Sequence, residues 1–232
     1  MHISTEERIK RLNGFTGKLK RNWSTRIARF IVGKRVLEIG CGYGTLVSFL
    51  KKRNYDVVGV DKDLEAVKVA KRIYGDINVK IADVYELPFS QGEFDTVILQ
   101  ESAHHLDFDR ALREIDRVCN KEVIVFDPNP NFILKLGRKI IGHLDPEAKI
   151  EDIIRVLESA EYKIRHIEFS DVFTLPLSGG LVGPRWFPEI GWIQDLMIKF
   201  DSVVNLLLRQ LSLQKFFCWR YLIIATKNNN SR

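Results

Sequence analysis

The sequence predicts a doubly wound α/β fold, in which helices cover both faces of a mostly parallel sheet. Residues 36–50 have the pattern of a buried strand, a glycine-rich turn and a helix. Further apolar segments alternate with amphipathic helical patterns along the chain, as in proteins built from βαβ units. Acidic residues directly follow the second and third of these segments, at the edge where ligands of such sheets bind.

The glycine-rich turn follows the first predicted strand, residues 36–39. Gly40, Gly42 and Gly44 occupy alternate positions there. Without a Cβ atom the backbone can turn sharply and approach a ligand closely. Thr45 then begins the first helix of the predicted sheet domain.

The remaining elements follow in order. Before the sheet, residues 4–12 and 18–32 have helical patterns, separated by a break at residues 13–17. Further strands are predicted at 57–61, 79–83, 94–100, 122–127, 163–171 and 220–227, and further helices at 45–53, 63–74, 108–118, 147–159 and 189–213. Pro128 and Pro130 should end the fifth strand and start another helix. Residues 228–232 form a polar tail that we expect to be disordered.

The spacing of the glycines distinguishes between two kinds of nucleotide site. A dinucleotide fingerprint, G-x-G-x-x-G, would need a third glycine where Thr45 stands. Residues 38–44, Glu-Ile-Gly-Cys-Gly-Tyr-Gly, instead resemble motif I of the class I S-adenosylmethionine-dependent methyltransferases, and the type-11-like small-molecule members of that family. The resemblance covers residues 36–171 and 218–227. It implies a seven-stranded Rossmann-like sheet whose last two strands form an antiparallel pair.

The resemblance also implies a set of cofactor-binding residues. The turn would wrap the methionine part of the cofactor, Asp61 would bind the ribose, and Asp83 and Val84 would hold the adenine. The full set is Glu38, Gly40, Cys41, Gly42, Gly44, Asp61, Lys62, Asp83, Val84 and Gln100. From the residues alone, a carboxylate at Asp61, 21 residues after Gly40, can accept two hydrogen bonds from a ribose diol.

Structural roles compete with these assignments. Asp61 could cap the helix near Leu64, although Asp63 is better placed to do so, and Asp83 could serve only a turn. Asp127, at the end of the fifth strand, could contact substrate or cap a helix.

The loop after the fourth strand supplies the candidate catalytic residues. Residues 101–106 are Glu-Ser-Ala-His-His-Leu, and several type-11-like members carry a similar His-His pair. The resemblance implies that this loop faces the methyl donor where the acceptor arrives. Imidazole titrates near neutral pH, so a histidine could act as a general base. Adjacent loop residues seldom point the same way; we expect His105 to face the site, with His104 as the second candidate. A structural hydrogen-bonding role stays open for both.

The same loop bears on the acceptor. Members that methylate amino groups of nucleobases or glutamine usually carry Asn or Asp, Pro, Pro and an aromatic residue there, which Gln100 to Ala103 do not match. O- or C-methylation is therefore favoured over nucleobase N-methylation.

Composition and length favour one cytoplasmic domain with insertions. The chain has 232 residues, 45% of them hydrophobic and 28% charged. It contains no apolar run of about 18 residues and no apolar signal core at its N-terminus. Cys41, Cys119 and Cys218 predict no disulfide framework, and no metal site is expected, because His2, His143 and His166 lack ligand spacing.

The net charge of +6 is uneven. Residues 1–35 hold ten Lys or Arg against two Glu, a net of +8, which leaves −2 for the remainder. Such an arm could contact nucleic acid, an anionic lipid surface or an acidic substrate, or simply present the solvated faces of two amphipathic helices. The resemblance implies that these helices form a lid over the cofactor, with Phe15 and Trp23 as cover residues; simple packing on the sheet is the alternative.

Residues 172–217 interrupt the family pattern with a long insertion before the last strand. Its second half has an apolar stripe at helical spacing: Ile193, Leu196, Met197, Phe200, Val203, Val204, Leu207, Leu208 and Leu211. Core packing, a lid over the acceptor site, and contact with lipid or a second copy all fit this pattern. The predicted organisation is a helical lid at 1–35, a cofactor-binding core at 36–171 and 218–227, and an acceptor lid at 172–217.

These observations favour an S-adenosyl-L-methionine-dependent methyltransferase that yields S-adenosyl-L-homocysteine and acts on a small-molecule or lipid-like acceptor. The alternatives are an RNA methyltransferase that uses the basic arm, a NAD-type oxidoreductase, and a non-catalytic protein that binds the cofactor. The sequence predicts neither the acceptor nor the oligomeric state, and it leaves peripheral membrane contact open.

Overall fold

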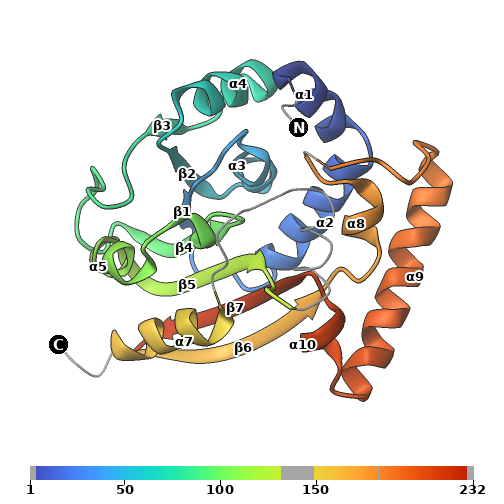
Figure 1. Cartoon of the computed structure of the whole chain (residues 1–232). Coiled ribbons are helices and arrows are strands. Elements are labelled where there is room, and N and C mark those ends of the chain that lie inside the picture. The colour runs from blue at the N-terminus through green and yellow to red at the C-terminus, as the bar shows by residue number, and fades with distance from the viewer. Residues whose placement is uncertain (1–3, 132–148, 182, 229–232) are drawn as a thin grey trace. The chain divides into compact units, whose positions relative to one another are not determined.

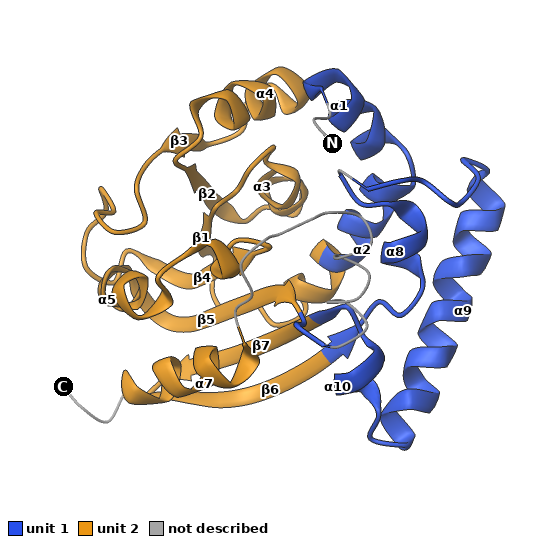
Figure 2. Ribbon diagram, in the orientation of Figure 1, with its two compact units in different colours: residues 1–23, 129–145, 169–220 blue, residues 24–128, 146–168, 221–232 orange. Residues whose placement is uncertain are grey.

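The computed structural model describes residues 4–131, 149–181 and 183–228. The chain divides into two compact units, shown in Figure 2. The first comprises residues 1–23, 129–145 and 169–220, and the second comprises residues 24–128, 146–168 and 221–232.

The second unit is built on a seven-stranded mixed sheet with the order β3-β2-β1-β4-β5-β7-β6 (Figure 1). The strands are β1 (Arg35–Ile39), β2 (Asp56–Asp61), β3 (Val79–Ile81), β4 (Phe94–Gln100), β5 (Cys119–Pro128), β6 (Tyr162–Ser170) and β7 (Arg220–Lys227). β1 to β5 pair in parallel and β7 runs antiparallel. The predicted fold class is confirmed. Successive strands run outward from β1 on one side and from β4 on the other, so strand order reverses between them.

The central strands β4 and β5 have continuous apolar segments at their centres, because helices cover both faces of such a sheet. Every residue of β4 is buried, and Val97, Ile98 and Leu99 have no exposed surface. Val123 and Ile124 of β5 are equally inaccessible. These strands form the core that fixes the carboxyl edge of the sheet.

The helices of this unit are α3 (Thr45–Lys51), α4 (Leu64–Tyr74), α5 (Phe108–Val118) and α7 (Ile150–Ser159), with a 3-10 turn η1 at Ala103–His105. Asp63 caps α4, because its Oδ1 accepts hydrogen bonds from the backbone N–H groups of Glu65 and Ala66. The expectation that Asp63 rather than Asp61 takes this role is confirmed.

Several predicted bounds were wrong at their ends. β3 stops at Ile81, because residues 83–86 form a turn instead. α3 ends at Lys51, two residues early. The helix predicted from residue 147 has its described start at Ile150, after the N-cap Lys149. The helix predicted after Pro130 and most of the polar tail lie outside the described residues.

The first unit contains α1 (Thr5–Asn13), the first turns of α2 (Phe15–Ala28), α8 (Thr174–Ser178), α9 (Gly191–Gln210) and α10 (Gln214–Phe217). The predicted break at residues 13–17 was too long, since only Gly14 separates α1 from α2. Gly17 is helical, and its missing side chain makes room for the carbonyl oxygen of Leu12, which would lie 1.6 Å from a Cβ atom. α2 also ends at Ala28, four residues before the predicted end.

Hydrogen bonds join the N-terminal helices to the insertion within this unit. The buried Arg11 donates through Nη1 to the carbonyl oxygens of Gly180, at 3.3 Å, and Gly183, at 2.7 Å. The Thr16 hydroxyl donates to the same Gly180 carbonyl at 3.1 Å. The N–H of Phe15 donates to the carboxylate of Glu189 at 3.1 Å. The arm and the insertion therefore support each other.

The predicted apolar stripe of α9 is not a core stripe. None of its nine residues is buried, and Leu196, Phe200, Val203, Leu207 and Leu211 are exposed. The buried residues of this helix are the polar Gln194 and Asp201. Core packing is therefore wrong for the five exposed residues, whereas Ile193, Met197, Val204 and Leu208 are half-buried. Within the described ranges, no helix is both long enough and apolar enough to cross a bilayer.

Candidate active site

The strand register brings the predicted cofactor residues to one edge of the sheet. Ile39, the last residue of β1, lies beside Val60 of β2 and Leu99 of β4. The next residues along each strand are Gly40, Asp61 and Gln100. These three therefore meet where the strand order reverses, the position at which open α/β sheets bind ligands.

The glycine turn is held in a conformation that favours glycine. Gly40 and Gly44 have φ values of +72° and +70°. A Cβ atom on Gly40 would lie 2.4 Å from the Cβ atom of Ser102, whose hydroxyl donates to the Ile39 carbonyl oxygen at 2.7 Å. The N–H groups of Gly40 and Cys41 both donate to the carbonyl oxygen of Val60. The turn is thus fixed against both neighbouring strands.

Gly42 marks open space at the tip of this turn. It has φ of +49°, and no atom outside its immediate neighbours lies within 4 Å of an ideal Cβ position. A side chain would enter that space, so the backbone there is accessible to a ligand. Its N–H donates to Oδ2 of Asp61 at 2.7 Å. Asp61 thereby ties the tip of the turn to the end of β2.

Asp61 keeps acceptor capacity in spite of these bonds. Its Oδ1 accepts from the N–H of Asp63 at 2.9 Å. Each oxygen of an ionised carboxylate has two acceptor sites, so each can still accept one further hydrogen bond. The neighbouring Lys62 is exposed.

Gln100 supplies a buried acceptor at the same edge. The residue is 7% exposed, and its Oε1 has no hydrogen-bond partner among the described residues. A buried polar oxygen is costly unless it is hydrogen-bonded, so this atom suits a ligand donor. Glu38 in β1 and Cys41 in the glycine turn are also buried. Burial, and then the charges of Glu38 and Asp61, raises the pKa of the Cys41 thiol, which therefore stays protonated.

Asp83 and Val84 lie in the turn after β3. Oδ1 of the exposed Asp83 accepts from the N–H of Tyr85 at 3.0 Å, and the Asp83 carbonyl oxygen accepts from the N–H of Glu86. Asp83 therefore has the role in a turn that the sequence analysis considered for it. Val84 is buried. Contact of these two residues with adenine stays a prediction.

His104 forms a buried pair with Asp127. Nδ1 of His104 lies 3.0 Å from Oδ1 of Asp127, and the backbone N–H of His104 donates to Oδ2 at 2.8 Å. His104 is 8% exposed and Asp127 is fully buried. His105 is exposed, and its ring centroid lies 3.9 Å from that of His104. One carboxylate thus fixes both the backbone and the ring of His104.

This pairing was not foreseen from the sequence, which left Asp127 as a substrate contact or a cap. The signal that could have found it is positional. Asp127 follows Phe126, which pairs with Gln100 across β4 and β5, so the chain leaves both strands at the same edge. The β4 loop then returns His104 to that edge through η1.

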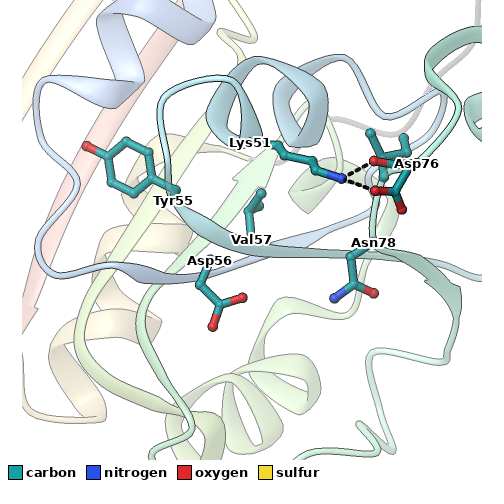
Figure 3. Close-up of a pocket in the computed structure, with 7 residues that line it drawn as sticks. Lys51, Tyr55, Asp56, Val57, Asp76 and Asn78 are labelled. Carbon is teal, nitrogen blue, oxygen red and sulfur yellow. Dashed lines mark hydrogen bonds and ion pairs between the residues drawn. The ribbon is translucent and has the colours of Figure 1, made fainter.

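A separate pocket of about 320 Å³ lies at the opposite ends of the strands (Figure 3). It is lined by Lys51, Tyr55, Asp56, Val57, Asp76, Ile77 and Asn78. Asp56 is the first residue of β2, whereas Asp61 is the last, so this pocket is distinct from the glycine turn. Lys51 forms an ion pair with Asp76 at 2.8 Å beside it.

Part of the basic arm is neutralised by acids. Lys18 pairs with Asp195 at 2.7 Å in the first unit. In the second unit, Arg26 pairs with Glu168 at 3.2 Å, and Arg35 contacts Asp95 at 3.4 Å. In the described part of the chain, no three His, Cys, Asp or Glu side chains gather as a metal site would need.

Comparison with known proteins gives the family of the domain that contains this site. Residues 37–126 match the family model described as a methyltransferase domain. The chain contains a methyltransferase domain of the S-adenosylmethionine-dependent class. Its cofactor is S-adenosylmethionine. The matched residues include the glycine turn, Asp61, the His104 loop and β5 as far as Phe126.

Individual relatives of this methyltransferase are distant. An O-methyltransferase, rstn1, of Aspergillus nomiae is 26% identical over 183 residues, which are 72% of this chain and 79% of that protein. A fatty-acid O-methyltransferase of Mycolicibacterium smegmatis is 34% identical over 100 residues, 41% of this chain and only 36% of that protein. The crystal structure of an S-adenosylmethionine-dependent methyltransferase from Archaeoglobus fulgidus has a TM-score of 0.66 at 22% identity, covering 90% of this chain and 94% of that one.

Proposed function

We propose that this methyltransferase transfers the methyl group of S-adenosylmethionine to a small-molecule or lipid-like acceptor, with an acceptor oxygen favoured. The observation that carries the proposal is the buried His104–Asp127 pair, which lies at the same edge of the sheet as the glycine turn. Oxygen acceptors such as hydroxyls lose a proton when they are methylated, and a histidine oriented by a carboxylate can take it.

The proposed cofactor site keeps the residues predicted from the sequence. Glu38, Gly40, Cys41, Gly42 and Gly44 would receive the methionine half, and Gln100 Oε1 would accept a hydrogen bond from it. Asp61, followed by Lys62, would bind the ribose diol, and Asp83 and Val84 would contact adenine. The open space beside Gly42 and the buried Gln100 Oε1 support this assignment.

The tautomer of His104 follows from its partner. An ionised carboxylate only accepts hydrogen bonds, so the ring must carry its proton on Nδ1 to bond Asp127. Nε2 is then left with a lone pair that can accept a proton from an acceptor hydroxyl. Asp127 also stabilises the charged ring that results. The bound cofactor supplies an electrophilic methyl group on a sulfonium, and alignment of the acceptor with it accounts for much of the acceleration.

Between the two histidines, the geometry supports His104 as the base. The sequence analysis expected only one of the two to face the site and favoured His105. Asp127 holds both the ring and the backbone of His104, whereas His105 is exposed. Preorganised groups contribute more to a transition state than mobile ones. The His105 ring packs against that of His104 at a tilt of 42°, with 3.9 Å between the ring centroids.

The class of acceptor draws on two further points. The curated relatives carry the names O-methyltransferase and fatty-acid O-methyltransferase, which support an oxygen acceptor with an apolar part. The loop at residues 100–103 also lacks the residues typical of nucleobase N-methylation. We also propose that residues 1–35 form a helical lid for the cofactor and that the 172–217 insertion forms the acceptor lid. The hydrogen bonds of Arg11 to the insertion support their acting together.

The test is radiolabelled methyl transfer to hydroxyl- and carboxyl-bearing acceptors with short and long apolar chains. Any acceptor that the wild type methylates is then offered to His104→Ala and His105→Ala. We expect His104→Ala to lose about 100-fold or more in turnover, while His105→Ala keeps it within about threefold. The reverse order would transfer the role to His105. Equal turnover of all three proteins would show that neither histidine acts as the general base.

An RNA methyltransferase that uses the basic arm is the competing function. Arg11 is buried against carbonyl oxygens, and Lys18, Arg26 and Arg35 pair with acids, which leaves less of the arm for phosphates. RNA binding through phosphates would fall steeply with salt. Salt-sensitive RNA affinity together with label in RNA would favour this alternative.

A further inference from the structure

The exposed apolar surface of this protein is concentrated in one part of the sequence. Seventeen large apolar side chains are exposed in the described residues. All but Val32, Leu64, Ile81 and Ile167 lie between residues 173 and 217. Scattered exposed apolar residues need no explanation, but a continuous group of them usually marks an interaction surface.

The group centres on one face of α9. Trp192, Leu196, Phe200, Val203 and Leu207 are spaced by four or three residues, which places them on one side of a helix. Their exposed fractions are 69, 59, 52, 57 and 52%. We call these five residues the outer face of α9. From Trp192 to Leu207 the outer face extends for roughly 22 Å along the helix.

The orientation of α9 is fixed by its polar side. Oδ1 of the buried Asp201 accepts from the backbone N–H groups of Val172, Phe173 and Thr174, at 3.1, 2.5 and 3.1 Å. Gln194, also buried, donates to the carboxylate of Glu189 at 3.0 Å. Rotating the helix to bury its outer face would break these bonds. The apolar side is therefore directed outward by specific contacts.

The charge that flanks the outer face is the cation of Lys199, whereas Arg209 lies towards the opposite side of the helix. Of the two acids of α9, Asp201 is buried on backbone N–H groups, and Asp195 pairs with Lys18 at 2.7 Å. The two basic residues of α9, Lys199 and Arg209, are exposed. In the sequence, the first unit carries 14 Lys or Arg against 7 Asp or Glu, a net of +7, while the rest of the chain has a net of −1.

We propose that the outer face of α9 docks this protein on the surface of a lipid bilayer that contains anionic headgroups. Helices of this kind lie in the interface with Trp, Phe and Leu among the acyl chains and with Lys and Arg at the headgroups. Trp192 at the start of α9 and Phe216 and Phe217 beyond its end add exposed aromatic rings, which suit that region. The contact is peripheral, since no described helix qualifies as a membrane span.

Charge favours lipid over a second copy of the chain as the partner of the outer face. Two copies joined at this face would bring the Lys199 side chains of both helices to one interface. Anionic headgroups would instead attract and neutralise this charge. The inference does not depend on the proposed methyl transfer, because docking can be measured without an acceptor.

The experiment is flotation of the full chain with vesicles of phosphatidylcholine alone or mixed with phosphatidylglycerol. We expect the wild type to float with the mixed vesicles, and less so at high salt. Replacing Leu196 and Leu207 together by Ser should weaken vesicle binding by about tenfold or more, because both side chains lose their apolar burial in lipid. The matched control replaces Val32 and Ile167 by Ser. These are exposed apolar residues of the other unit, and their loss should leave flotation unchanged.

Three results would overturn the proposal. They are failure of the wild type to float with either vesicle, equal flotation of the Leu196/Leu207 variant, and equal loss in the control. Sedimentation velocity without lipid examines the competing occupant. A dimer that the Leu196/Leu207 variant dissociates would assign the face to a second copy. Thermal unfolding and S-adenosylhomocysteine binding of each variant establish that it is folded.

Discussion

Replacing Asp61 by Ala should abolish most of the affinity for the cofactor. The carboxylate joins Gly42 at 2.7 Å to Asp63 at 2.9 Å, and it would also accept the two ribose hydroxyls. A hydrogen bond to a charged group contributes about 1.5–3 kcal/mol. Two such bonds to ribose therefore account for about 3 kcal/mol or more. That corresponds to a dissociation constant about 100-fold higher, before any loosening of the glycine turn is counted.

The neighbouring Asp63 provides a matched control. Asp63→Ala removes another carboxylate two residues away, but that carboxylate caps α4 through the N–H groups of Glu65 and Ala66. We expect a loss of about 1 kcal/mol in unfolding free energy and little change in affinity. Calorimetric titration of S-adenosylhomocysteine into wild type and both variants measures the difference. An Asp61→Ala protein that is folded and binds within about threefold of wild type would refute the ribose assignment.

Three further predictions concern other residues. Asp127→Asn should slow methyl transfer by about tenfold or more with unchanged cofactor affinity, because an amide can hold the His104 ring in the wrong tautomer. Steady-state rates measure the first effect and calorimetry the second. An unchanged rate would contradict this prediction. Asp95→Asn should destabilise the fold by about 1–3 kcal/mol at pH 7. Burial raises the pKa of Asp95, but the N–H of Arg35, the Lys121 side chain and further donors outweigh this, so the pKa is lowered. The stabilisation by the Asp95 carboxylate is therefore present above the ordinary pKa of 3.8 and is lost as the pH falls through the lowered pKa. In urea titrations the difference in unfolding free energy between wild type and variant should shrink below pH 3.8. A difference that stays constant with pH would contradict this prediction. Burial raises the pKa of the Cys119 thiol to about 11. This thiol should therefore not react with Ellman's reagent at about pH 8 until urea unfolds the chain. Reaction of Cys119 in the native protein would contradict this prediction.

The sheet could be predicted from the sequence because its signals are local. Buried parallel strands are continuous apolar runs, and β4 was predicted with the bounds that the structure has. Asp63 was recognisable as a cap because capping depends on residues two and three positions away. The Asp61 position followed from the length of one βαβ unit, although its hydrogen bond to Gly42 was not anticipated.

The features that escaped prediction depend on distant contacts. The His104–Asp127 pair joins residues 23 positions apart and needs the register of β4 and β5. Gly17 looks like a helix breaker by propensity, but the close approach of the Leu12 carbonyl oxygen requires a glycine there. In α9, an apolar stripe has the same spacing whether it faces a core or the outside. The hydrogen bonds of the buried Asp201 and Gln194 show which way it points.

The central claim is that the edge formed by Gly40, Asp61 and Gln100 holds the cofactor. A crystal structure of the protein with S-adenosylhomocysteine tests it most directly. We predict density for the amino-acid half against the backbone of Gly42, with the ribose hydroxyls on the Asp61 carboxylate. Density for the ligand at another place, such as the pocket beside Lys51 and Asp76, with this edge unaltered, would contradict the account.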